Sequence, residues 1–188
     1  MGNMDDLTLN KFKENIGLGT RPNRFDVNMV IPGSAKGGGE FTMTTEVAAA
    51  SLPASVVNPI FVPFRGRTLK IPGDRQYGSW NFTVIDPQPN IQQLWQNLHG
   101  WSDKINDHVT NETDWSPEAA DNFTANWTIH HHALNGGLPI KEITLYNCWP
   151  TMVGEFALNH SAADQLSSFS VTVEYEYFDF EKINVSGG

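Results

Sequence analysis

The feature that most constrains this fold is a strict alternation of apolar and polar side chains across residues 168–177. The apolar positions are Phe169, Val171, Val173, Tyr175 and Tyr177. Ser, Thr and Glu residues occupy the positions between them. A period of two places each kind of side chain on its own face of a β-strand, so we predict a strand with one buried and one solvated face. Such strands are typical of antiparallel sheets.

Shorter alternations recur upstream, each bounded by Gly, Pro or Asn. They predict strands over residues 25–31, 41–47, 80–85 and 123–131, and around Ile143 and Leu145. Between the first two, Pro32-Gly33 and Gly37–Gly39 favour a hairpin loop. About seven strands in total indicate a mainly β fold, an antiparallel sandwich or barrel-like arrangement.

One segment has helical periodicity instead. Its apolar positions are Ile91, Leu94, Trp95, Leu98, Trp101 and Ile105. These spacings place them on a single stripe, and Asn90 with Gln93 fits an N-terminal cap. We predict one amphipathic helix that packs on a sheet and shields it from water.

The remaining long segments are predicted as loops or ends. Residues 50–75 contain Pro53, Pro59, Pro63 and Pro72, which central strands do not accommodate, so we predict a long loop with short edge pieces. Within it, Pro72-Gly73-Asp74 is expected to turn the chain after a brief pairing at Arg67–Ile71. We also expect an insertion loop at 102–122. The domain would then comprise 21–178, flanked by an arm at 1–20 and a tail at 179–188.

The chain of 188 residues has a formal net charge of −9 and a pI near 5.0. This net negative charge argues against a protein that binds nucleic acid through its phosphates. One stretch alone is locally basic, and it consists of Arg65, Arg67, Lys70 and Arg75 with Asp74 as the opposing charge. Three interpretations stay open for it: a solvated loop or strand edge, a protein–protein contact, and direct DNA binding.

Catalytic and cofactor patterns are weak in this sequence. His130 and His132 would share one face of a strand, as some zinc ligands do, with His99, His108, His160 or a carboxylate as a third ligand. Cys148 is the only cysteine, which excludes a cysteine-rich zinc site and an internal disulfide. No nucleophile elbow or phosphate-binding loop occurs. We expect no enzyme, no cofactor and no bound metal.

No apolar run approaches the roughly 20 residues that span a bilayer, so we expect no membrane segment. The acidic start of the chain, residues 1–6, lacks the apolar core of a secretory signal. Trp115 and Trp127 permit one further reading, as sugar-stacking aromatics of a carbohydrate-binding β-sandwich.

Five segments, in this order, resemble the tail tube protein of contractile-tailed bacteriophages. They are residues 21–27 (RPNRFDV), 50–75 from ASLPA to PGDR, 80–84 (WNFTV), 149–155 (WPTMVGE) with Leu158, and 169–177 (FSVTVEYEY). The Gly-rich stretch at 33–40 and the stretch at 102–122 look inserted relative to the family. Asn159-His160 stands where the family often has Asp-Trp.

The resemblance implies a structural protein with a β-sandwich flanked by a helix. It implies hexameric rings that stack into a tube inside a sheath, through which the phage genome passes into the host. Implied partners are further copies of the chain and the sheath, tape-measure, baseplate and tail terminator proteins, with DNA only in transit. The implied location is the virion, after assembly in the host cytoplasm. A tube terminator or baseplate hub component with the same fold is the alternative.

Three groups of residues are candidates for this function. The assembly candidates are Arg65, Arg67, Lys70, Asp74 and Arg75. Glu174 and Glu176 are expected to line the channel, because carboxylates there would repel DNA phosphates. Trp149, Pro150 and Gly154 form a structural motif, in which we expect Trp149-Pro150-Thr151 to turn the chain between two strands with a buried indole.

Overall fold

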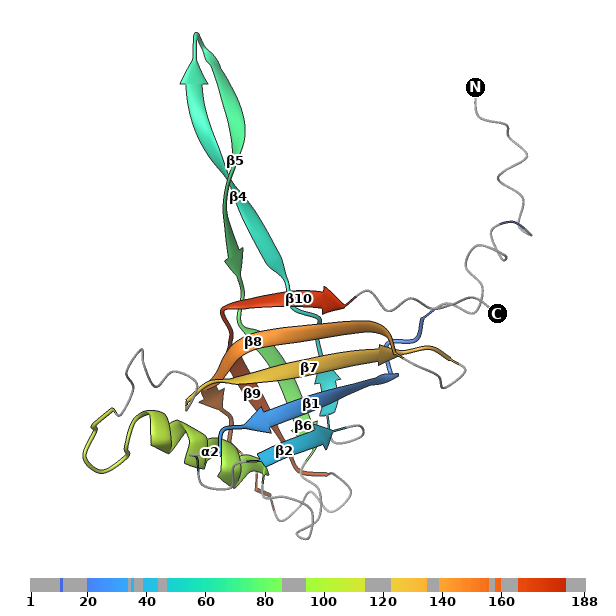
Figure 1. Cartoon of the computed structure of the whole chain (residues 1–188), viewed down its shortest axis with the longest axis vertical. Coiled ribbons are helices and arrows are strands. Elements are labelled where there is room, and N and C mark those ends of the chain that lie inside the picture. Colours follow the sequence, from blue (N-terminus) through green and yellow to red (C-terminus); the bar gives the residue numbers. More distant parts are fainter. Residues whose placement is uncertain are drawn as a thin grey trace.

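The computed structural model describes residues 11, 20–33, 35, 39–43, 47–85, 94–113, 123–134, 139–155, 158–159 and 166–181. These residues form a two-sheet sandwich, a helix beside it and a long hairpin that projects away from it (Figure 1). None of the helices in the described part of the chain combines the length and the apolar character that crossing a membrane requires.

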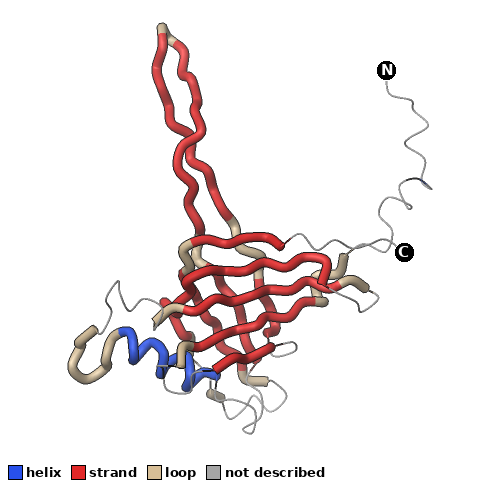
Figure 2. The backbone as a smooth tube through the Cα atoms, viewed as in Figure 1, coloured by secondary structure: helices blue, strands red, loops and turns tan. Residues whose placement is uncertain are grey.

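All strand pairs in the described residues are antiparallel, which confirms the mainly β prediction. The first sheet has the order β2-β1-β7-β8-β10, and the second has the order β8-β9-β6-β3. The first contains β1 (Phe25–Ile31), β2 (Gly39–Met43), β7 (Ala125–His132), β8 (Pro139–Val153) and β10 (Tyr177–Glu181). The second adds β3 (Val47–Ala50), β6 (Trp80–Ile85) and β9 (Ser168–Glu174). The strands of the two sheets cross steeply (Figure 2).

The core lies between the two sheets and is built by the alternations seen in the sequence. Val27, Met29 and Ile31 of β1 belong to the same core cluster as Val171 and Val173 of β9, and all five are buried. Three buried tryptophans fill the centre: Trp80, Trp101 and Trp127. The ring of Trp127 meets those of Trp80 and Trp101 at about 6 Å between centroids.

Strand β8 belongs to both sheets because it bends in the middle. Its first half pairs with β7 and β10, and its second half pairs with β9. Asn147 lies at the bend with a φ of 54°, a left-handed conformation that Asn tolerates better than most residues. The predicted turn at Trp149-Pro150-Thr151 was therefore wrong: these residues continue the strand after the bend, and Trp149 is half-buried.

The helix α2 (Leu94–Ile105) confirms the predicted amphipathic segment, with Leu94, Leu98 and Trp101 buried. The Trp101 indole donates a hydrogen bond to the Phe123 carbonyl at 2.7 Å. Because α2 runs to Ile105, the loop predicted at 102–122 begins four residues too early. Its part at 106–113 is described, while 114–122 and the predicted cap at Asn90 and Gln93 lie outside the described residues.

The long alternation at the end of the chain is one strand only as far as Glu174. The chain bends at residues 175–176, and Tyr177 starts β10, where its exposed ring stacks on Tyr146 at 4.6 Å. Tyr177 therefore does not continue the buried face, as the alternation had predicted. Strand β10 also runs three residues past the predicted boundary at 178, and the division into arm, domain and tail stays a prediction.

Candidate assembly surface

The segment predicted as a long loop at 50–75 is instead a hairpin, so that prediction was wrong. Strands β4 (Ser55–Phe64) and β5 (Arg67–Tyr77) pair only with each other and project beyond the sandwich (Figure 1). Arg65 and Gly66 form the tip with φ values of 47° and 78°. Positive φ at both central residues is the geometry of the two-residue turn that matches the twist of a hairpin.

The prolines that argued against strands sit where a two-stranded ribbon tolerates them. Pro59 lies opposite Pro72, and Pro63 lies opposite Thr68. Pro63 is four residues beyond Pro59, so both belong to the set of positions whose N–H would point away from the partner strand. A proline there removes no hydrogen bond from the ladder, and Pro72-Gly73-Asp74 continues β5 rather than turning the chain.

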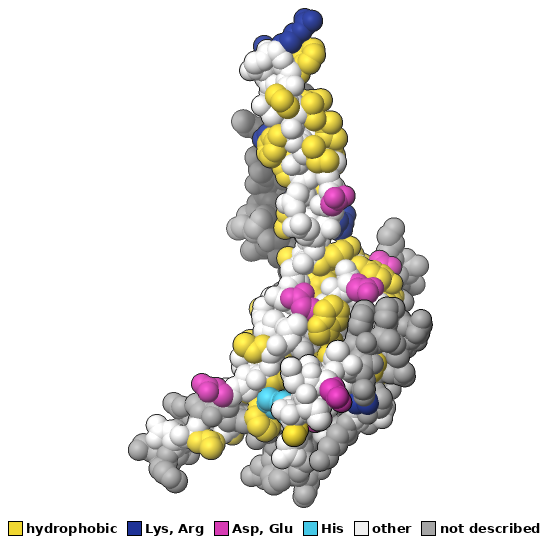
Figure 3. All heavy atoms as spheres, turned by 90° about the vertical axis from the view of Figure 1, so that its left-hand side faces the viewer, with side chains coloured by type: hydrophobic (Ala, Val, Ile, Leu, Met, Phe, Trp, Pro, Cys, Tyr) yellow, Lys and Arg dark blue, Asp and Glu magenta, His cyan; other side chains and the backbone are white. Residues whose placement is uncertain are grey.

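One face of the hairpin is apolar and exposed. Register places Ile60 beside Ile71 and Val62 beside Leu69, with Phe64 next toward the tip. These side chains are 39–66% exposed, and Phe64 is the most exposed of them. Figure 3 shows hydrophobic side chains along the hairpin and cationic ones at its tip. Soluble monomers rarely expose apolar side chains in such a contiguous group.

All five predicted assembly residues lie on this hairpin. Arg65 is part of the tip and Arg67 follows it, and the Lys70 ammonium lies 5.8 Å from the ring centre of Phe61. Arg75 donates a hydrogen bond to the Ser55 hydroxyl at 3.0 Å, and Asp74 is exposed. The hairpin that carries the apolar face therefore also carries four cations and one carboxylate.

The foot of the hairpin is fixed to the sandwich by aromatic rings. The Tyr77 ring lies 6.0 Å from that of Tyr175 and 5.4 Å from that of Phe178. Burial raises the pKa of the Tyr175 phenol. The Trp80 indole donates to the Ser51 carbonyl, in the short segment between β3 and the hairpin. These contacts set the direction in which the hairpin projects.

Of the candidate channel residues, Glu174 ends β9 and Glu176 lies between β9 and β10. Glu174 is half-buried and shares the solvated face of β9 with Ser168, Ser170 and Thr172. Glu176 is exposed, and its carboxylate accepts a hydrogen bond from the Asn147 amide at 2.7 Å. Their position facing a channel stays a prediction.

The motif residues join three elements. Gly154 follows β8, and its N–H donates to the Ser170 carbonyl at 2.7 Å. A Cβ at Gly154 would lie 2.7 Å from that oxygen, so no other residue fits without a shift. The Gly154 carbonyl accepts from the Trp95 indole at 2.9 Å, which ties α2 to the sheet. Pro150 is buried beside them in β8. The motif is thus a packing junction.

The histidine pair lies in a cluster that sequence reasoning missed. The carboxylate of Asp26, on β1, is hydrogen-bonded to His130 Nδ1 at 2.6 Å and to His132 Nε2 at 2.5 Å. Glu142 of β8 lies 3.7 Å from His130 Nε2 on the other side. Only the register of three strands brings these side chains together. The described residues contain no group of three or more His, Cys, Asp or Glu arranged to hold a metal ion.

The other candidate ligands and the sugar-stacking residues do not gather at one place. His99 and His108 lie on and after α2, and His160 lies outside the described residues. Trp127 is buried and donates its indole N–H to the Val30 carbonyl at 2.8 Å, so it cannot stack on a sugar. Trp115 also lies outside the described residues.

Comparison with known proteins agrees with the segments identified in the sequence. A family model described as phage tail tube protein matches residues 20–181. The tail tube protein gp19 of Enterobacteria phage T4 is 26% identical over 159 residues, which cover 85% of this chain and 90% of that protein. The tail tube protein of Serratia phage KSP90 is 24% identical over 184 residues, with 89% and 94% covered.

Solved structures show the same fold at low identity. A chain of the anti-feeding prophage baseplate matches with a TM-score of 0.61 at 15% identity, over 86% of this chain and 95% of that one. A chain of the PVC sheath–tube complex, an extracellular contractile injection system, matches with a TM-score of 0.59 at 15% identity, over 90% and 97%. Since the family model spans most of the sequence, the chain belongs to the phage tail tube protein family, whose members are structural, non-enzymatic components of the virion.

Proposed function

We propose that copies of this chain form hexameric rings, that the rings stack into the inner tube of a contractile tail, and that the tube conducts phage DNA into the host. The observation that carries the proposal is the exposed apolar face of the β4–β5 hairpin. The number of subunits in a ring rests on the family, and the hairpin supplies a physical reason for stacking.

The hairpin needs a partner surface to become stable. A lone two-stranded ribbon is marginally stable in water, and none of the residues of β4 or β5 is buried. Docking Ile60, Val62 and Phe64 on another copy removes their apolar surface from water. A repeated self-contact of this kind is the usual way in which identical chains build closed or stacked assemblies.

The sheets offer a second set of contacts. In the described residues, β2 and β10 are the outer strands of the first sheet and β3 is an outer strand of the second. Outer strands carry backbone N–H and C=O groups without a strand partner on one side. A ring in which neighbouring copies pair these strands would satisfy those groups and enclose a channel.

Charge gives the stacking its register. The hairpin cations would meet acidic residues of a neighbouring copy, with Asp179 and Glu181 of β10 as candidates. Exposed ion pairs contribute about 0–1 kcal/mol each, so they select alignment more than strength. Reversing Arg67 and Arg75 to Glu should shorten the rods and lower the salt concentration at which they dissociate. Lys141→Glu, an exposed change on β8, is the control. Unchanged rod length and salt tolerance would exclude this role.

The channel proposal concerns Glu174 and Glu176. Carboxylates on the wall would repel the DNA backbone and let it slide. Replacing both by Gln should slow DNA ejection from assembled virions, and replacing both by Lys should slow it further, while tube length stays constant. The graded series isolates charge, because Gln keeps the acceptor that Asn147 uses at Glu176. Ejection at the normal rate in the Lys variant would place these residues elsewhere.

The proposed partners are further copies of the chain and the sheath, tape-measure, baseplate and tail terminator proteins, with assembly in the host cytoplasm. Support for the sheath comes from the PVC complex, whose description pairs sheath and tube. A terminator or baseplate component stays the alternative, because chains of a baseplate and of a sheath/tube terminator share the fold. Negative-stain images of the purified protein separate them: long hollow rods for a tube, isolated rings for a terminator, monomers for neither.

A further inference from the structure

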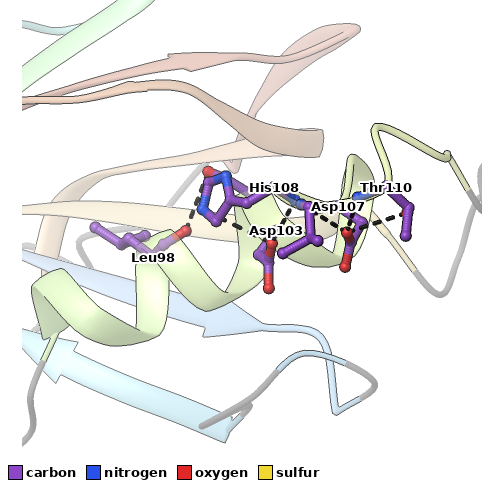
Figure 4. A network of polar contacts seen from close by, with 7 residues as sticks. Leu98, Asp103, Asp107, His108 and Thr110 are labelled. Carbon is purple, nitrogen blue, oxygen red and sulfur yellow. Dashed lines mark hydrogen bonds and ion pairs between the residues drawn. The ribbon is translucent and has the colours of Figure 1, made fainter.

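The loop after α2, residues 106–113, is held in one shape by its own hydrogen bonds. The Asp107 carboxylate accepts from the Val109 N–H at 2.8 Å and from the Thr110 N–H at 2.7 Å. Asp103 accepts from the His108 N–H at 3.0 Å, so the loop is also tied to the helix (Figure 4). The backbone N–H groups of Thr110 and Val109 hold the pKa of Asp107 below its usual value.

This rigid loop presents an apolar side chain at its tip. Val109 is 92% exposed, the highest value among the large exposed hydrophobic residues of the described chain. The loop carries Asp107 and Glu112, and the end of α2 beside it adds Asp103 and Lys104, so acidic residues outnumber basic ones here. An ordered polar loop that holds a valine in water is suited to insertion into a partner, because little entropy is lost on binding.

An apolar pocket of about 160 Å³ lies on the sandwich. Its wall comes from Pro22 and Phe25, from residues 50–52, and from Ile129 and His131. Arg21 and Arg24 are exposed on the segment that contributes Pro22 and Phe25. The pocket is therefore lined mainly by apolar side chains, and two exposed arginines are sequence neighbours of its lining residues.

The loop and the pocket lie on opposite sides of the molecule. In Figure 1 the loop after α2 is at the far left, whereas β1 begins and β7 ends at the right, where the pocket residues are found. A surface and its complement on opposite sides make a head-to-tail contact between identical chains, and such contacts form a ring when the rotation between copies closes.

We infer that Val109 of each copy enters the pocket of the next copy around the ring, with the acidic loop against Arg21 and Arg24. This inference rests on the proposed ring assembly and adds the contact that orients neighbouring copies within a ring. The occupant is a second copy of this chain. The charge pairs predict that ring association weakens as salt rises.

Cysteine cross-linking tests this contact cleanly in the assembled protein. Val109→Cys and Ser51→Cys, placed in one chain, put a thiol on the loop tip and one on the pocket. Cys148 will not interfere, because it is buried and burial raises its pKa to about 12. A short bismaleimide should then give a ladder of covalent dimers, trimers and larger species from rings or rods seen in negative stain. The matched control is Leu158→Cys with Ser51→Cys, since Leu158 is 89% exposed.

The outcomes separate this inference from the proposed function. Rings or rods that form but give no more ladder than the Leu158 control would overturn the Val109 contact and leave the tube proposal intact. Wild-type protein that forms neither rings nor rods would overturn the tube proposal, and this inference with it.

Charge reversal gives a second, independent measurement. Arg24→Glu should weaken ring association roughly tenfold at low salt, Glu112→Arg should do the same, and the double reversal should recover part of the loss. Val109→Asp should weaken association by about tenfold or more without lowering the urea midpoint, because the side chain is solvated in the free chain. Full association by the Asp variant would contradict the insertion.

Discussion

The sandwich and the hairpin use apolar residues in opposite ways. In the sandwich, tryptophans and branched side chains are buried within one chain, and Trp80, Trp101 and Trp127 are among its largest fully buried residues. In the hairpin, a comparable density of Ile, Val, Leu and Phe stays exposed. The sandwich thus buries its apolar surface within one chain, whereas the hairpin carries apolar surface that another molecule must cover. The two regions should respond differently to the same kind of substitution.

The sharpest test compares two aromatic deletions. Trp127→Ala removes a buried ring and its hydrogen bond to the Val30 carbonyl, and should lower the free energy of unfolding by about 3–5 kcal/mol in urea titration. Phe64→Ala should change that free energy by no more than about 0.5 kcal/mol, because the ring is 66% exposed, yet it should impair rod formation. Equal losses of stability in the two variants would contradict the comparison.

Substitution of two glycines, one in each region, tests the same difference with a smaller expected effect on stability. Gly154→Ala places a Cβ 2.7 Å from the Ser170 carbonyl and should destabilise the sandwich by about 1–3 kcal/mol. Gly73→Ala places one 2.6 Å from the Asn58 carbonyl, inside the hairpin, and should reduce rod formation with little change in the urea midpoint. Gly78→Ala, with nothing within 4 Å, is the control for both. A large shift of the midpoint in Gly73→Ala would show that the hairpin and the sandwich unfold together.

The smallest expected effect is a pH dependence of stability that arises from His99 on α2, the helix that packs on the sandwich. Burial, with a further contribution from His108, lowers the pKa of His99 below 6.5. The unfolded chain then binds this proton more readily than the folded one, so the contribution of His99 to stability falls as pH drops through about 6.5 toward the folded value. His99→Gln should flatten the change in urea midpoint between pH 7.5 and 5.5. An identical slope in wild type and variant would remove His99 from the explanation.

Much of the sandwich could be predicted from the sequence because its signals are local. The strands at 25–31 and 80–85 and the helix stripe depend on spacing along one segment, and the structure confirms them. The strand predicted over 168–177 is confirmed only as far as Glu174. The hairpin was missed because prolines argue against central strands, and nothing local shows that β4 and β5 have no further neighbours. The basic residues were found, since charge can be counted, but their placement on one apolar ribbon needed the register.

Local residue patterns were therefore enough to predict the class of fold, the amphipathic helix and the resemblance to the tail tube family, since each follows from residue types at short spacing. Three features emerged only from the folded chain: the place where β8 bends from one sheet to the other, the contacts of His130 and His132 with Asp26, and the positions of the loop after α2 and the pocket on opposite sides. These features depend on contacts between residues about 20 to more than 100 positions apart, and the energy of such contacts exists only after distant strands have paired.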